Sequence, residues 1–182
     1  QTYLFGFLME SKMLLETFNI RRIIVKNFLI TLITLFFTSA AFADDYFKAL
    51  ELFNLRKIEN SLSLFKKVAE DEKNSKRSDA MFNLAVIYDN GFGVPVDKMR
   101  ALYYYKEASS LSNKYAQYNL GWKYYNGESV NKDVIKAFEL YKAAADFGHP
   151  QAMYNLGNMY YTGTGTVKDL KMAYRTFLLS RM

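Results

Sequence analysis

Few residues in this chain are of types that carry out acid–base, nucleophilic or metal chemistry. The sequence has no cysteine and a single histidine, His149, between Gly148 and Pro150. Transition-metal sites and Cys/His nucleophile sites need several such side chains in one place, so their scarcity disfavours both. We interpret His149 as a surface residue at a helix end. The sequence predicts no catalytic residue, no cofactor and no metal, and therefore a protein that is not an enzyme.

Two recurring patterns resemble chemical motifs but have simpler structural explanations. Gly-containing segments begin at three equivalent positions: Gly91, Gly127 and Gly163. None is followed by the Lys-Ser/Thr pair of a phosphate-binding loop, so we interpret them as turns. Aspartates recur six residues after each of these glycines: Asp97, Asp133 and Asp169. We expect each of them to cap the N-terminus of a helix by accepting a backbone N–H bond.

Aromatic and amide side chains are the remaining candidates, and their chemistry is partner binding. Tyr118, Trp122 and Tyr125 are spaced i, i+4, i+7 and therefore share one helical face. Tyr and Trp are favoured in interfaces because they bury a large area and keep a polar tip. The candidate partner-binding residues are these three and residues at related positions: Phe82, Tyr118, Trp122, Tyr125, Asn126, Tyr154, Asn158 and Tyr161. The alternative is that these aromatic residues pack against neighbouring helices.

A repeat of 36 residues determines where these side chains lie. Seven positions keep the same residue in all three copies at this spacing, beginning with Ala80, Ala116 and Ala152 and ending with Ala101, Ala137 and Ala173. A fixed period of this length indicates stacked helix pairs. The first helices are expected at 79–90, 115–126 and 151–162, and the second helices at 98–111, 134–147 and from 170 onward. Two stripes should form the core between paired helices: Ala116, Leu120 and Tyr124, and Ala137, Tyr141 and Ala144.

An atypical helix pair is expected before the first repeat, within residues 44–70. Phe47, Leu50 and Phe53 would form the buried face of its first helix. A pair of this kind covers the end of a repeat stack. With the polar segment 71–78 it makes an N-terminal capping unit, 44–78, followed by repeats at 79–114, 115–150 and 151–182. The third repeat stops within or just at the end of its second helix, and a truncated sequence or a partner-contacting end would each explain this.

The repeat pattern A-x-x-x-L-G-x-x-Y-x-x-G-x-G-V-x-x-D-x-x-K-A-x-x-x-Y-x-x-A-A-x-x-G resembles the Sel-one-like repeat (SLR), which is related to the tetratricopeptide repeat. The similarity covers 79–182, with local departures such as Ser129 in place of a loop glycine. It implies an all-α fold, an α-solenoid of antiparallel helix pairs in a right-handed superhelix. It also implies that the first-helix aromatic positions line a concave surface that binds a protein or peptide.

The N-terminal part of the chain has the composition of an export signal. Within 20–43, a basic leader precedes an apolar run and the small residues Ala41 and Ala43. We expect cleavage after Ala43 and a periplasmic or secreted protein, with 1–19 as an upstream extension. The alternative is an inner-membrane anchor formed by 20–43.

The charge pattern disfavours nucleic acid as a partner. The formal net charge is +6, but Lys and Arg alternate with Glu and Asp instead of forming a dense basic stripe. The favoured hypothesis is a non-catalytic periplasmic adaptor or scaffold that holds a peptide or protein in an aromatic-lined groove. The alternatives are a cell-wall-associated enzyme or cell-wall-fragment-binding protein, and a structural subunit of an envelope assembly.

Overall fold

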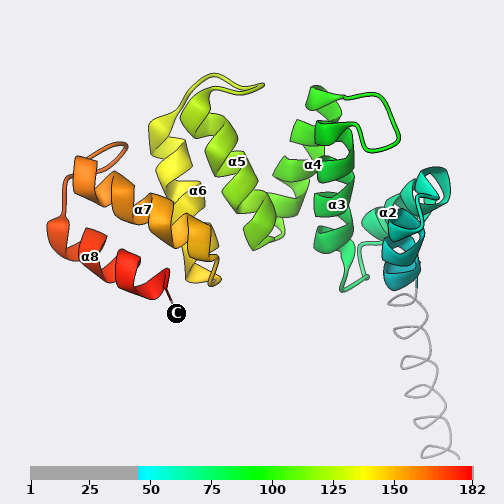
Figure 1. The fold of residues 1–182 in the computed structure, drawn as a ribbon, viewed down its shortest axis with the longest axis horizontal. Helices are drawn as coiled ribbons and strands as arrows, with labels where there is room; N and C mark the ends of the chain where they lie inside the picture. Colours follow the sequence, from blue (N-terminus) through cyan, green and yellow to red (C-terminus); the bar gives the residue numbers. More distant parts are fainter. Residues whose placement is uncertain (1–44, 182) are drawn as a thin grey trace, which may run out of the picture. The chain divides into compact units, whose positions relative to one another are not determined.

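The computed structural model describes residues 45–181, and this part of the chain consists of helices and loops without a strand (Figure 1). A helical segment covers residues 45–54, and the following helices are α2 Ile58–Glu70, α3 Arg77–Asn90, α4 Lys98–Ser110, α5 Lys114–Asn126, α6 Val134–Asp146, α7 Pro150–Thr162 and α8 Leu170–Leu179. The predicted all-α fold is therefore confirmed. The expected signal segment, the extension before it and Ala43 lie outside the described residues.

Each helix packs against its neighbours in sequence. The most extensive contacts join α3 to α4, α5 to α6 and α7 to α8, and these are the helix pairs of the three repeats (Figure 1). Smaller contacts join α2 to α3, α4 to α5 and α6 to α7, so each pair also packs on the next. This is the arrangement of an α-solenoid. None of the helices in residues 45–181 combines the length and apolar character that a membrane crossing requires.

The helix ends follow from the residues that recur at them. The first helix of each repeat ends at a glycine in the left-handed conformation: Gly91, Gly127 and Gly163. After a short loop, an aspartate side chain accepts a hydrogen bond from the backbone N–H three residues later at the start of α4, α6 and α8. The predicted caps Asp97, Asp133 and Asp169 are confirmed, with N···O distances of 2.9 Å.

The core lies between paired helices and is made mainly of alanine, leucine and tyrosine. All six residues of the two predicted stripes are buried: Ala116, Leu120, Tyr124, Ala137, Tyr141 and Ala144. Alanines at the contact let the helix axes approach, and the larger side chains fill the space between them. Truncation of a buried leucine such as Leu120 to alanine would cost about 2–5 kcal/mol of stability.

The predicted buried face of the first helical segment is partly wrong. Phe47 is 56% exposed, whereas Ala49 is fully buried and Leu50 and Phe53 are half-buried. The buried face instead includes Tyr46, whose ring lies 5.9 Å from that of Phe65 in α2. Tyr46, Ala49, Leu50 and Phe53 are spaced i, i+3, i+4 and i+7 and therefore share one helical face. Phe47 does not belong to this set.

Candidate functional site

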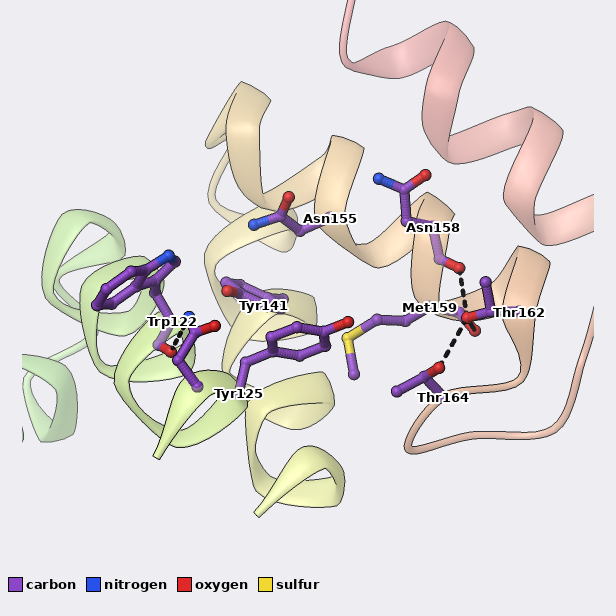
Figure 2. A pocket seen from close by; sticks show the side chains of 9 residues that line it. Trp122, Tyr125, Tyr141, Asn155, Asn158, Met159, Thr162 and Thr164 are labelled. Carbon is purple, nitrogen blue, oxygen red and sulfur yellow. Dashed lines mark hydrogen bonds between the residues drawn. The ribbon is translucent and has the colours of Figure 1, made fainter. Parts of the chain in front are cut away.

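A cavity of about 260 Å³ opens between α5, α6, α7 and the loop that follows α7 (Figure 2). Its walls come from two successive repeats: Trp122, Tyr125, Asn126, Tyr141, Asn155, Asn158, Met159, Thr162 and Thr164. We call this cavity the aromatic pocket. It lies at the junction of the second and third repeats.

One wall of the aromatic pocket is a group of three rings. Trp122 and Tyr125 lie on α5 and remain 43% and 37% exposed, so solvent reaches both. Tyr141 contributes from α6 and is almost completely buried. Burial raises the pKa of Tyr141 well above its ordinary value, and the neighbouring Asn155 side chain offsets part of this effect. The Tyr141 hydroxyl is therefore neutral and able to donate a hydrogen bond at physiological pH.

The rest of the lining is mostly polar but carries no formal charge. Asn126 lies on α5 beside the rings, and its side-chain amide donates to the backbone oxygen of Trp122 at 2.9 Å, which leaves its side-chain oxygen as an acceptor. The Thr162 hydroxyl donates to the backbone oxygen of Asn158 and lies 2.8 Å from the Thr164 hydroxyl. The side-chain amide of Asn158 makes no hydrogen bond with another residue in the described part of the chain. A lining of rings, amides and hydroxyls can bind an uncharged group, and it contains no acid–base pair.

The structure separates the eight predicted partner-binding residues into two groups. Trp122, Tyr125, Asn126 and Asn158 line the aromatic pocket. The other four lie outside it: Phe82, Tyr118, Tyr154 and Tyr161. The rings of Phe82 and Tyr118 are half-buried against neighbouring helices, as the packing alternative predicts. Tyr154 and Tyr161 are more than half exposed; Tyr154 contacts a ring of α8 and Tyr161 lies under the Lys168 ammonium.

The interpretation of His149 as a surface residue is wrong. His149 is 5% exposed, and its Nδ1 accepts a hydrogen bond from the Ala152 backbone N–H at the start of α7. Its ring stacks on Tyr118 with 4.5 Å between ring centroids. Burial lowers the pKa of His149 and the nearby Lys114 lowers it further, so the ring is a neutral cap. The neighbours Gly148 and Pro150 indicated a helix boundary but did not reveal that Tyr118 on α5 covers the residue that caps α7.

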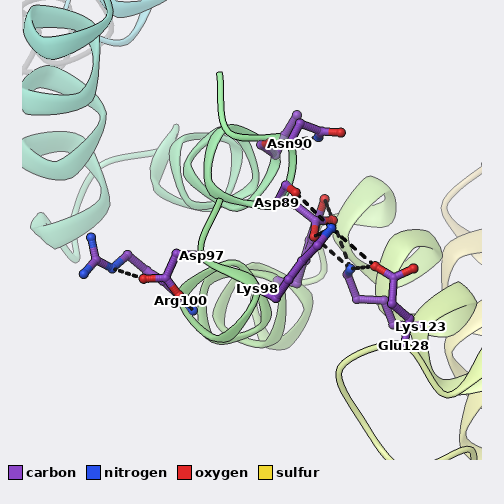
Figure 3. Close-up of polar contacts among 9 residues, drawn as sticks. Asp89, Asn90, Asp97, Lys98, Arg100, Lys123 and Glu128 are labelled. Atoms are coloured by element: carbon purple, nitrogen blue, oxygen red, sulfur yellow. Dashed lines mark hydrogen bonds and ion pairs between the residues drawn. The ribbon is translucent and has the colours of Figure 1, made fainter. Parts of the chain in front are cut away.

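A buried ion-pair network is the feature that sequence reasoning missed (Figure 3). The Lys123 ammonium lies 2.9 Å from a carboxylate oxygen of Asp89 and 3.0 Å from one of Glu128. Lys98 also contacts both carboxylates, at 2.9 Å and 3.6 Å. The side chain of Lys123 is 2% exposed and that of Asp89 is 14% exposed. The network joins α3 and the start of α4 to α5 and the loop after it, and so connects the first two repeats.

Burial and charge act in opposite directions on Asp89. Burial alone would raise the pKa of this carboxyl, but the hydrogen bonds from Lys98 and Lys123 outweigh burial, and its pKa lies below the ordinary value. The Asp89 bond raises the pKa of Lys98 correspondingly. A signal for this network was present in the sequence. Lys123 stands at a repeat position held by Ile87 and Met159, and a lysine at an apolar position needs a partner.

Comparisons with known proteins agree with this geometry. The Sel1 repeat family model matches residues 78–113, 114–149 and 150–175. A 52-residue stretch is 36% identical to the Sel1-repeat-containing protein YjcO of Escherichia coli K12 and covers 29% of this chain and 23% of that protein. The chain thus spans about a quarter of the length of this curated relative.

Solved structures of similar fold include two bacterial proteins. A Sel1 repeat protein from Oxalobacter formigenes superposes with a TM-score of 0.67 at 26% identity, over 74% of this chain and 54% of that one. The protein c5321, a protective antigen of uropathogenic Escherichia coli strains with an SLR fold, gives a TM-score of 0.61 at 29% identity, over 67% of this chain and 25% of its own. The α-solenoid of antiparallel helix pairs is common to all three.

Proposed function

The chain belongs to the Sel1 repeat family, and on this basis we propose that it is a non-catalytic adaptor that binds a peptide segment of a partner protein in the aromatic pocket. Proteins of this family generally mediate protein–protein interactions. The observation that supports this site is the exposure of Trp122 and Tyr125 at the mouth of a cavity between two repeats. Aromatic side chains in a recess are the usual centres of binding energy at protein interfaces.

The size and lining of the cavity favour a peptide over a cofactor. At about 260 Å³ the aromatic pocket lies below the range of about 300–1,000 Å³ that is typical of small-molecule sites. Amide side chains such as Asn158 can hydrogen-bond a peptide, and the rings of Trp122 and Tyr125 can cover its apolar groups. The proposed site of action is the periplasm or the cell exterior, a proposal that depends on the sequence of 20–43 alone.

The experiment is selection of peptides from a phage-displayed random library on the purified full-length protein. Peptides that bind wild type should lose about tenfold or more in affinity for Trp122→Ala and Tyr125→Ala, because each change removes a ring from the pocket wall. Phe147→Ala is the matched control, since Phe147 is also a 55% exposed aromatic residue but does not line the pocket. Fluorescence anisotropy of labelled peptides measures the affinities. Selection of no peptide, or equal binding to all four proteins, would contradict the proposal.

A further inference from the structure

The positions that line the aromatic pocket have equivalents one repeat earlier, 36 residues before them in the sequence. There the side chains contact one another and fill the space between the repeats. Subtracting 36 from four pocket residues, Tyr125, Tyr141, Met159 and Thr164, gives Asp89, Tyr105, Lys123 and Glu128. Asp89, Lys123 and Glu128 belong to the ion-pair network at the first junction (Figure 3), and the hydroxyl of Tyr105 contacts Asp89. The two junctions between repeats therefore use equivalent positions in different ways.

At the first junction, the side chain of Lys123 occupies the space between the repeats. Its ammonium is bound by Asp89 and Glu128 and lies 5.5 Å from the ring centroid of Tyr105. The Tyr105 hydroxyl lies 3.4 Å from a carboxylate oxygen of Asp89. Asp89, Glu128 and Tyr105 thus surround the Lys123 side chain, which is only 2% exposed.

At the second junction, the ring remains but every charged member is replaced. Tyr141 keeps the position of Tyr105, whereas Met159 replaces the lysine and Tyr125 and Thr164 replace the two carboxylates. Val134 stands at the position of Lys98. The result is the open aromatic pocket, lined by rings, amides, hydroxyls and a thioether (Figure 2). Met159 takes the place of Lys123 and is itself buried, and the cavity beside it is open to a group from outside.

We propose that the aromatic pocket receives one uncharged aromatic side chain, a tyrosine, from a peptide segment of the partner protein. This inference rests on the proposed function and specifies the residue that the site recognises. The volume of about 260 Å³ suits a single large side chain. The rings of Trp122, Tyr125 and Tyr141 pack on the incoming ring, because aromatic pairs favour edge-to-face and offset contacts. The Asn158 amide and the free side-chain oxygen of Asn126 are available to the phenolic hydroxyl.

A charged side chain is disfavoured in this pocket. The carboxylates that balance the ammonium at the first junction have no counterpart here, so a buried lysine from the partner would lose its hydration without an ion pair. The Lys132 ammonium also lies 5.8 Å from the Tyr125 ring centroid and would repel a second cation.

The first experiment uses Trp122, the single tryptophan of the sequence, as a reporter in the pocket. The indole N–H resonance of the full-length protein is followed by NMR while N-acetyl-tyrosine amide, N-acetyl-phenylalanine amide or N-acetyl-lysine amide is added. We expect the tyrosine probe to shift the resonance at about tenfold lower concentration than the lysine probe. It should bind about two- to tenfold more tightly than the phenylalanine probe, a difference that Asn158→Ala should reduce. A lysine probe that binds as well as the tyrosine probe would overturn the inference.

The second experiment fills the pocket with the residues of the first junction. The triple variant Tyr125→Asp, Met159→Lys, Thr164→Glu places a lysine and its two carboxylates at equivalent positions, and it should fold because the first junction already contains this set. Circular dichroism and thermal unfolding check the fold. We expect the tyrosine probe to no longer shift the Trp122 resonance, and full retention of binding would overturn the inference. If the triple variant does not fold, Tyr125→Ala, which removes one ring from the pocket wall and introduces no charge, supplies the comparison, and unchanged binding of the tyrosine probe to it would overturn the inference.

These outcomes separate the inference from the proposed function. Library peptides that bind through Trp122 but contain no aromatic residue, or that tolerate tyrosine-to-lysine replacement, would leave the peptide-binding function in place and overturn the tyrosine pocket. Failure of every library peptide to depend on Trp122 or Tyr125 would instead remove the proposed function. Enriched peptides that need one tyrosine for binding, and that no longer bind the triple variant, would support both the proposed function and the tyrosine inference.

Discussion

Gln117 contains a buried oxygen that the described part of the chain leaves without a hydrogen bond. Its side chain is 6% exposed, and its Oε1 has no partner, whereas its amide nitrogen makes one long bond of 3.5 Å to the Ser109 oxygen. Methionine holds the equivalent position in both other repeats, at Met81 and Met153. A buried polar atom without a partner costs about 1–3 kcal/mol, and methionine has a similar shape and no such atom.

We therefore predict that Gln117→Met stabilises the protein by about 1 kcal/mol. The Ser109 oxygen would still accept a bond from the Ser112 backbone N–H at 3.0 Å, so the change leaves no new unpaired group. The measurement is the urea concentration at half-unfolding. The reverse change Met81→Gln is the matched control and should destabilise the protein. A lower midpoint for Gln117→Met would show that the amide contributes a contact that outweighs its unpaired oxygen.

At single residues, the sequence predicted roles that depend on local neighbours and missed those that depend on another repeat. The Asp97 cap was predictable because its partner is the backbone three residues away. Lys123 was not predicted, because its partner Asp89 lies 34 residues earlier and no local pattern joins them. His149 shows the same limit, since the ring that covers it comes from Tyr118 on the preceding helix pair.

At the level of elements, the loop after the first helix of the third repeat also contacts the second repeat. Gly165 has a φ of +71°, and a Cβ atom there would lie 2.8 Å from the backbone carbonyl carbon of Val134 at the start of α6. Gly148 has a similar φ of +76°, but nothing lies within 4 Å of a Cβ placed on it. The two glycines therefore share a backbone conformation and differ in the space around them.

We predict that Gly165→Ala costs about 1–3 kcal/mol more stability than Gly148→Ala. Both variants pay for alanine in the left-handed region, about 1–2 kcal/mol, and only Gly165→Ala also displaces the backbone of α6. Thermal unfolding of both variants gives the difference directly. Equal costs would mean that the loop shifts away from Val134 without loss, and that it does not hold the third repeat against the second.

Helix boundaries were the most predictable feature at this scale where a glycine marks the end of each first helix and an aspartate marks the start of each second helix. The expected start of α6 at Val134 and the ends of α5 and α7 agree with the structure. The first helical segment lacks the repeat pattern, so its buried face had to be inferred from the spacing of three apolar residues. That inference misplaced Phe47, which the structure leaves 56% exposed.

At the level of the described solenoid, stability depends on contacts between successive helix pairs as well as within them. The first junction has the buried network of Asp89, Lys123 and Glu128, and the second has the aromatic pocket in the equivalent place. The period of 36 residues predicted that both junctions exist. It could not predict that ion pairs close the first junction while the second is open, because that difference lies at positions where the copies disagree, such as Lys123 and Met159.

The ion-pair network makes the solenoid less stable at acidic pH, because Asp89 must be ionised to bind the two lysines. Its pKa in the folded protein is below the ordinary 3.8, so the folded state binds fewer protons than the unfolded chain in the acidic range. The resulting stabilisation is complete above the unfolded pKa and is lost as pH falls through the folded value.

We predict that Asp89→Asn lowers stability by about 3 kcal/mol near neutral pH, because Lys123 loses a buried partner. Its stability should then decrease less steeply than that of wild type between about pH 5 and pH 2. Urea midpoints at a series of pH values test both statements, and parallel curves for the two proteins would mean that Asp89 does not couple the first two repeats to pH.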